Sequence, residues 1–448
     1  MRLRPDLSGL TRRQWLAGAT GLGALAAWQQ RGYAEITSNN AATRGTARAV
    51  ILVNLQGAPS HLDTFDPKDG PWNPADAALT PGAGNILLSR TLFPGLLKLS
   101  SDLLLLRSVQ SWEAVHERGQ FYLQTAHPAN PAFLAESPNI GSVVGLERGG
   151  EGPLPPFLSL NGSPDQGAKF LGGKVEPMSA PSNPGGLNTL QHNFFGTAAQ
   201  SQARFESQYK LLLDLDSSLR ANAPDLAMSN HGDFYSAAKG LMYQPSIIQI
   251  FQFTDADNQR YGNSNFGRAC IVARNAVQAK AGTVFININH GGWDMHQNMF
   301  DRAYRPNMYQ MCADLDSGVS SLASDLRISG DLSQTLIVMM GEFGRTPGEL
   351  NPRGGRDHHK EAMAAAMLGG GVVGGRALGG TDPIGDRVAD YGWSQNRVIR
   401  MEDIAATMYS ALGIDWTKGI TDTPSGRKFE YVPFGQAGVY VPIEEVWG

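Results

Sequence analysis

The order of apolar and polar positions along the chain predicts a repeating succession of strands and helices. Short, nearly continuous apolar runs, typical of parallel strands covered on both faces, stand at residues 49–55, 103–106, 283–288, 335–340 and 364–368. Apolar positions three and four residues apart, typical of amphipathic helices, stand at residues 266–277, 308–326 and 404–412. Strands that alternate with helices predict right-handed crossovers and an α/β fold, with a mostly parallel central sheet and helices on both faces.

Acidic side chains follow three of the predicted strands directly. Asp63, Asp294 and Glu342 each stand just past the carboxyl end of an apolar run. Ligands of such sheets bind beyond the carboxyl ends of the strands. We therefore expect the three loops that carry these carboxylates to meet at one edge of the sheet.

The loop after residues 283–288 carries two candidate metal ligands. Asp294 and His296 stand two residues apart, after the pair Gly291 and Gly292. Side chains at this spacing share a face in extended backbone but lie roughly 200° apart around a helix. The two can converge on one ion if the segment is a strand or a loop, which the glycines favour.

A third block, Arg356 to His358, adds to this set of oxygen and nitrogen donors. Asp294 with His296, Glu342, and Asp357 with His358 would supply ligands for one divalent ion or two. Without nearby thiolates, this set suits zinc, manganese, magnesium or calcium.

Three further side chains are candidates for catalytic work. Arg345 and Arg356 stand beside the expected ligands and could hold a tetrahedral anion, although each alone is more often a structural salt-bridge partner. His116 begins a helical pattern, where backbone N–H groups favour anions. It could serve as base or nucleophile, or as an ordinary cap or surface residue.

The N-terminus indicates export. Arg12 and Arg13 precede a modest apolar segment, residues 16–28, which is too short to span a bilayer of about 30 Å. We interpret residues 1–34 as a twin-arginine secretory signal, which directs the protein to the periplasm or outside the cell. Residues 35–48 have the composition of a linker, and the α/β domain is expected over 49–448, with no integral membrane segment in the mature chain.

Charge excludes nucleic acid as a partner. Residues 1–34 carry five of the 37 Lys and Arg residues and one of the 41 Asp and Glu residues, which leaves 32 basic against 40 acidic side chains and a net charge of −8. Such a chain repels phosphodiester backbones. The sequence leaves the oligomeric state open.

Residues 150–265 differ in character from the rest of the domain. Prolines and glycines cluster in the first part, and a helical pattern with Phe205, Tyr209 and Leu212 at matching positions stands at residues 199–219. We expect a loop-rich cap inserted over the core.

The motif blocks resemble those of a known family. They are Gly57 to Lys68, Gly291 to His296, Gly341 to Pro347 and Gly355 to His358, with further agreement at Ser137 to Ser142, Leu154 to Phe157 and Arg400 to Thr407. In order and content these resemble the signature blocks of the DUF1501 family, exported bacterial proteins related to the alkaline phosphatase and sulfatase superfamily. The resemblance implies an alkaline-phosphatase-like α/β sandwich.

The chain departs from the superfamily pattern in three places. Gln56 stands where the first strand commonly ends in a metal-binding aspartate, so Asp63 or Asp66 would have to substitute. Glu342 and Phe343 stand where an Asp-His pair is expected. His116 stands near the position of the usual Ser or Thr nucleophile, and no Ser or Thr occupies that position. A covalent phospho-intermediate is therefore in doubt. His290 and His359 lie beside the blocks but are not residues that the resemblance implies.

Two functions follow as hypotheses. The first is an exported metal-dependent hydrolase of phosphate or sulfate esters, acting on a small anionic ester. The second is a non-catalytic envelope or glycan-binding protein on a degenerate scaffold, which the missing nucleophile favours. A serine hydrolase using Ser60 or Ser111 is disfavoured, because no G-x-S-x-G elbow surrounds either.

Overall fold

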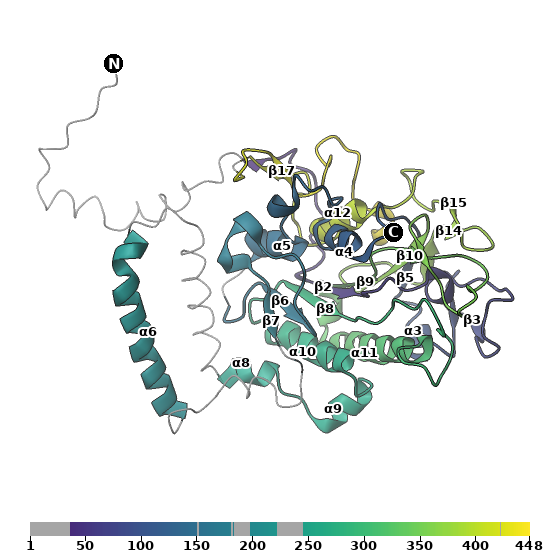
Figure 1. The fold of residues 1–448 in the computed structure, drawn as a ribbon, viewed down its shortest axis with the longest axis horizontal. Coiled ribbons are helices and arrows are strands. Elements are labelled where there is room, and N and C mark those ends of the chain that lie inside the picture. The colour runs from purple at the N-terminus through teal and green to yellow at the C-terminus, as the bar shows by residue number, and fades with distance from the viewer. Residues whose placement is uncertain (1–35, 150–151, 181, 183–197, 222–244, 422) are drawn as a thin grey trace, which may run out of the picture.

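The core of the described part of the protein is an eight-stranded sheet. The computed structural model describes residues 36–448 except 150–151, 181, 183–197, 222–244 and 422 (Figure 1). The sheet order is β13-β5-β12-β9-β2-β8-β6-β7. Its strands are β2 (Ala49–Asn54), β5 (Leu104–Val109), β6 (Phe157–Leu160), β7 (Met178–Ala180), β8 (Phe285–Asn289), β9 (Thr335–Met340), β12 (Met363–Leu368) and β13 (Arg376–Leu378).

The sheet is mostly parallel, as the succession of strands and helices predicts. Each pair of neighbours runs parallel except those that include β12, which is antiparallel to both β5 and β9. All residues of β2, β8 and β9 are buried. Strands covered on both faces need apolar side chains in both directions, which explains their continuous apolar runs.

Helices cover both faces of the sheet. On β2, Ile51 and Val53 pack in one hydrophobic cluster, while Val50 and Leu52 pack in the other. Figure 1 shows the two helical layers on opposite sides of the strands. One layer contains α3 (Pro94–Lys98), α10 (Asn265–Ala279) and α11 (Met308–Ser329), and the other contains α4 (His116–Thr125), α5 (Ile140–Arg148) and α12 (Met401–Ala411). Each buried aliphatic side chain in these layers stabilises the fold by about 1.5–3 kcal/mol.

Smaller elements surround this core. The strands are β1 (Ile36–Thr37), β16 (Gly419–Ile420) and β17 (Phe429–Glu430) in one sheet, and the pairs β3 (Leu79–Pro81) with β4 (Leu87–Ser89), β10 (Gly344–Arg345) with β11 (His358–His359), and β14 (Gly380–Thr381) with β15 (Val388–Asp390). Among the described residues, the other α-helices are α6 (Ala198–Ala221), α8 (Pro245–Ile250) and α9 (Asp255–Arg260).

The segment expected to be a cap is in part core. β6 pairs with β8, and β7 pairs with β6, so residues 157–160 and 178–180 extend the central sheet. The physical reason is the apolar run from Phe157 to Leu160, which is buried throughout. The expected helix at 199–219 is present as α6, which stands apart from both layers (Figure 1).

Two expectations concern the export signal and membrane-spanning helices. The secretory signal expected at residues 1–34 lies outside the described residues. Among the helices that are described, none is both long enough and apolar enough to cross a membrane.

Candidate metal centre

The candidate site lies where four parallel strands end. β2 pairs in register with β8 and β9, so that Asn54 lies opposite Asn289 on one side and Met340 on the other. The loops that follow these three strands therefore start at one edge of the sheet. β5 runs in the same direction, and the segment after it leads into α4 at His116.

Three imidazole nitrogens converge on one carboxylate oxygen. Oδ1 of Asp294 lies 3.0 Å from Nε2 of His296, 3.2 Å from Nε2 of His116 and 3.5 Å from Nε2 of His358. The Nε2 atoms of His296 and His358 lie 3.1 Å apart. The ligand atoms of His116, Asp294 and His358 all lie within 4.8 Å of one another.

These separations fit the ligand shell of a small divalent ion. Zinc binds imidazole nitrogen and carboxylate oxygen at about 2.0–2.1 Å, so neighbouring ligands of a tetrahedral site stand about 3.3–3.4 Å apart. Nε2 of His116 is buried and lacks a hydrogen bond of ordinary geometry among the described residues. A donor set that includes imidazoles favours zinc over magnesium or calcium.

Each histidine is held by an acceptor at its other nitrogen. Nδ1 of His116 lies 2.7 Å from Oε1 of Glu342, and Nδ1 of His296 lies 2.6 Å from Oδ1 of Asp357. Nδ1 of His358 donates to the carbonyl of Ala114 at 2.8 Å. A carbonyl can only accept, so the neutral ring presents a lone pair at Nε2. This arrangement is the usual support of metal-binding histidines.

Glu342 acts behind His116 rather than in the converging group. Its side chain is fully buried, and Oε1 also accepts the backbone N–H of Gly57 at 3.0 Å. Oε2 accepts from Gln120 at 2.8 Å, and the amide of Asn54 in turn donates to Gln120 at 2.9 Å. The sequence pattern does not single out Gln120 or Asn54. The position of Gln120 could have indicated it, because a polar residue one turn after His116 lies on the same helix face.

Gly57 fixes the turn on which this network rests. Its φ of +100° is unfavourable for other residues, and a Cβ there would lie 2.6 Å from the backbone nitrogen of Asp294. Its carbonyl accepts from Arg345. The close approach of the two loops therefore requires glycine.

Arg345 is a buried cation beside the group. Nη2 donates to Oδ1 of Asp294 at 2.6 Å, and Nε donates to the carbonyl of Ala58 at 2.8 Å. In the β10–β11 pair, Arg345 lies directly opposite His358. This pairing explains how two blocks separated by a glycine-rich turn reach the same place.

Asp63 and Arg356 lie elsewhere, which corrects the expectation that they would bind a metal and an anion. Both side chains are buried and form an ion pair with Nε 2.6 Å from Oδ2. Nη1 of Arg356 also donates to the carbonyls of Thr346 and Gly348 at 2.8 and 2.7 Å. Asp66, the other candidate substitute, pairs with Lys68 and Thr381. These groups satisfy one another and so have structural roles.

Asp357 also differs from its expected part as a ligand. Besides His296, its carboxylate accepts from Arg353 at 3.0 Å and from Asn351 at 3.2 Å. It orients His296 from the solvent side, with 46% of its side chain exposed. The described residues thus gather ligands for one ion.

The charges around the group favour cation binding. Burial acts to raise the pKa of Asp294, but the hydrogen bond and charge of Arg345 outweigh it and bring that pKa to about 2. Burial lowers the pKa of His358. The hydrogen bond to Glu342 raises the pKa of His116, with burial acting against it. The low pKa of Asp294 and the lowered pKa of His358 favour the ligand forms of both groups, whereas the raised pKa of His116 makes a proton a stronger competitor of a cation there.

The sequence of residues 47–438 matches one family, described as "Protein of unknown function (DUF1501)". The chain belongs to the DUF1501 family. The family predicted from the motif blocks is thereby confirmed. No curated protein matches this DUF1501 chain.

Solved structures similar to the DUF1501 chain include a sulfatase, a protein in the alkaline phosphatase superfamily and a phosphonate monoester hydrolase. The PsFucS1 sulfatase from Pseudoalteromonas sp. shares 15% identity at a TM-score of 0.39, covering 94% of this chain and 74% of its own. A protein in the alkaline phosphatase superfamily from Vibrio parahaemolyticus shares 12% identity at a TM-score of 0.37, and the match covers 86% of this chain and 70% of that protein. The phosphonate monoester hydrolase SpPMH from Silicibacter pomeroyi shares 12% identity at a TM-score of 0.36, and the match covers 87% of this chain and 76% of that protein.

Proposed function

We propose that this protein is an exported, metal-dependent hydrolase of phosphate or sulfate esters. The observation that carries the proposal is the convergence of three Nε2 atoms on Oδ1 of Asp294, with each Nδ1 held by an acceptor. The ester class comes from the resemblance of the motif blocks to the alkaline phosphatase and sulfatase superfamily. The signal motif at residues 1–34 supports export by the twin-arginine route.

The proposed ligands are Asp294, His116 and His358, whose ligand atoms all lie within 4.8 Å of one another, with His296 beside them. Structural zinc sites are closed by four protein ligands, whereas catalytic sites take three and keep the fourth position for water or substrate. A divalent cation held here supplies Lewis-acid chemistry, polarising an ester oxygen and acidifying a water. A set of three protein ligands therefore favours a catalytic over a structural ion.

Arg345 and Glu342 have distinct roles in this proposal. Arg345 places a fixed positive charge beside the group, where negative charge develops on a phosphoryl or sulfuryl oxygen. Glu342 holds the ring of His116 and fixes its Nε2 toward the ion. Neither needs to touch the ester's alcohol, so the substrate range is set elsewhere.

The attack is assigned to water. In the described part of the chain, the hydrogen bonds and ion pairs of Asp294, His116, His296 and His358 involve no hydroxyl or thiol side chain. This matches the sequence, in which His116 stands near the usual Ser or Thr nucleophile.

A matched pair of neighbouring histidines tests the proposal. His358 faces the group, whereas His359 bonds the carbonyl of Asp386 at 2.8 Å. Metal content is measured for the purified chain, for His358→Ala and for His359→Ala. Hydrolysis of p-nitrophenyl phosphate, bis(p-nitrophenyl) phosphate and p-nitrophenyl sulfate is followed in parallel. We expect His358→Ala to lose metal affinity and activity by about 10–100-fold or more, and His359→Ala to retain both. A metal-loaded wild type that is inactive on all three esters overturns the proposal.

The same lack of a side-chain nucleophile favours a second candidate, a non-catalytic envelope or glycan-binding protein. In that case the ion is structural. Chelator treatment distinguishes the two, because ester hydrolysis would be lost on chelation and restored by zinc. Partner binding that survives both chelation and His358→Ala would instead support the non-catalytic role.

A further inference from the structure

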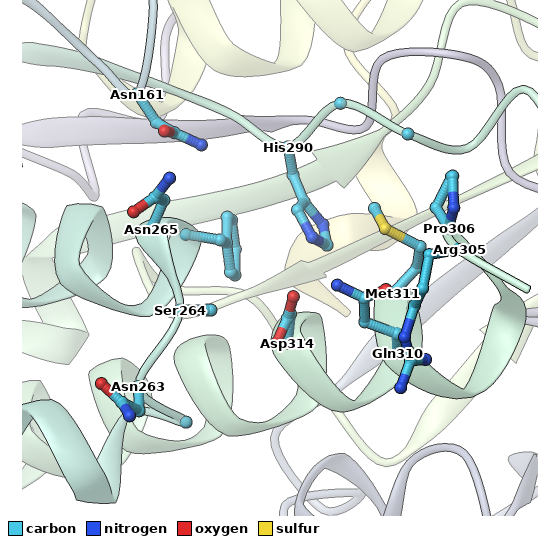
Figure 2. A pocket seen from close by; sticks show the side chains of 14 residues that line it. Asn161, Asn263, Ser264, Asn265, His290, Arg305, Pro306, Gln310, Met311 and Asp314 are labelled. Atoms are coloured by element: carbon cyan, nitrogen blue, oxygen red, sulfur yellow. The ribbon is translucent and has the colours of Figure 1, made fainter. Parts of the chain in front are cut away.

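A cavity of about 690 Å³ lies beside the candidate metal centre but uses other side chains. Its walls come from the loop after β6, the start of α10, the loop after β8 and the start of α11 (Figure 2). Gly291 and Gly292 line it and lead on to Asp294, so the two sites share one loop. The volume is within the range of small-molecule sites, about 300–1,000 Å³.

His290 is the unusual residue of this cavity. It is only 4% exposed, and neither ring nitrogen has a hydrogen-bond partner among the described residues. The ring stacks on Phe266, with 4.3 Å between ring centroids, and meets Trp293 edge-on at 5.4 Å. Buried polar atoms are nearly always satisfied. Two unsatisfied nitrogens on a ring that is firmly packed point to a partner from outside the chain.

The ring of His290 points into the middle of the cavity. Figure 2 shows Asn161 and Asn265 on one side of it, Gln310 and Met311 on the other, and Asp314 across from it. Burial lowers the pKa of His290 to about 3, so the ring is neutral at physiological pH. A neutral imidazole offers one donor and one acceptor, which is the pairing that a hydroxyl group makes.

The walls repeat this mixture of donors and acceptors. Asn161, Asn265 and Gln310 each contribute a side-chain amide, and an amide both donates and accepts. Asn161 already donates to the carbonyl of Asn289 at 2.8 Å, and Asn265 already accepts from Arg268 at 3.2 Å. The amide of Gln310 makes no hydrogen bond within the described residues, and the side chain is exposed. Met311 and Pro306 add apolar surface.

The formal charges of the lining cancel. Arg305 and Asp314 contribute one positive and one negative group, and the guanidinium of Arg305 has no ion pair in the described part of the chain. An anion would meet Asp314 and a cation would meet Arg305. A neutral ligand with several hydroxyl groups and an apolar face fits the lining best.

We propose that this cavity binds a neutral sugar unit, with the His290 ring hydrogen-bonded to its hydroxyl groups and Gln310 closing over it. The sugar's hydroxyls supply both partners that the ring lacks. Its C–H face lies against Met311 and Pro306. Sugar binding in this cavity does not require ester hydrolysis at the metal centre.

Two variants and a control test this proposal. Binding of the methyl glycosides of galactose, glucose and mannose is measured by saturation-transfer NMR and calorimetry. His290→Phe keeps the stacking on Phe266 but removes both nitrogens, and Gln310→Ala removes an exposed amide. Gln202→Ala on α6, outside the cavity, is the matched control. Circular dichroism is measured for all three, to show that the variants are folded.

We expect at least one glycoside to bind the wild type, with affinity reduced about tenfold in His290→Phe and Gln310→Ala and unchanged in Gln202→Ala. Gln310→Ala keeps the test decisive if His290→Phe does not fold. Two results overturn the proposal. One is the absence of binding by all three glycosides, which leaves hydration as the partner of His290, and the other is wild-type affinity in both cavity variants.

Discussion

Replacement of Glu342 by glutamine separates the support of the metal centre from its ligands. The glutamate is fully buried and accepts three hydrogen bonds, from Gly57, His116 and Gln120. Glutamine keeps the shape but has one acceptor oxygen and one amino group. Whichever way the amide turns, an N–H must face a donor, unless Gln120 turns as well. The charge that holds His116 is lost in either case.

The expected loss of zinc affinity follows from the hydrogen bond between His116 and Glu342, which loses its charged acceptor. A hydrogen bond to a charged group contributes about 1.5–3 kcal/mol. At about 1.4 kcal/mol for each factor of ten, this corresponds to a loss of about 10–100-fold in affinity. The same range is typical when the partner of a metal-binding histidine is removed. We therefore expect Glu342→Gln to weaken zinc binding by about 10–100-fold.

Asp357→Asn is the matched control, since Asp357 also holds a histidine of the group. Its side chain is 46% exposed, whereas Glu342 is fully buried. Water can replace an exposed acceptor and screens its charge, so the asparagine variant should lose much less affinity. Zinc affinity is measured by competition with a chromophoric chelator, and circular dichroism checks that both variants are folded.

Two outcomes would refute this reasoning. A folded Glu342→Gln protein with wild-type zinc affinity would show that His116 needs no support or binds no ion. A larger loss in Asp357→Asn than in Glu342→Gln would show that burial does not set the strength of these contacts.

Three further predictions follow from the geometry. Gly57→Ala should lower the free energy of unfolding by about 1–3 kcal/mol, measured in urea, because φ is +100° and the Cβ would meet Asp294. Arg356→Gln should cost about 3–5 kcal/mol by leaving Asp63 buried and unpaired; loss of zinc affinity in its folded fraction would contradict a structural role. The pKa of Asp294 falls from 3.8 to about 2 on folding. Its contribution to the stability of the metal-free protein is therefore present above pH 3.8 and lost as the pH falls through about 2. In thermal melts, the melting temperature of the wild type should therefore fall more steeply than that of Asp294→Asn as the pH drops from 3.8 to about 2. Parallel pH profiles of the two proteins would contradict the lowered pKa.

The sequence predicts the sheet and the meeting of its loops because both depend on local patterns. The runs at 49–55, 283–288 and 335–340 are apolar because both faces of each strand are covered. Parallel strands then bring their following loops to one edge. The spacing of Asp294 and His296 required a non-helical segment, and the structure has a loop there in which the two side chains meet.

The sequence could not tell a ligand from a support. A carboxylate that follows a strand looks the same whether several histidines converge on it, as on Asp294, or whether it supports one histidine from behind, as Glu342 does. The partner decides, and the partner of Glu342 is 226 residues away in the chain. The pairing of Asp63 with Arg356 spans 293 residues and is equally invisible to any local pattern.

The sequence by itself therefore determined the α/β class, the family and the set of polar residues near the sheet edge, because spacing and hydrophobicity encode them locally. Only the tertiary structure decided which of these residues converge and which satisfy one another. It also placed His290, with two nitrogens lacking partners, in a cavity between two helices. Burial and hydrogen-bond partners are set by packing between distant segments, and that packing assigns a role to each side chain.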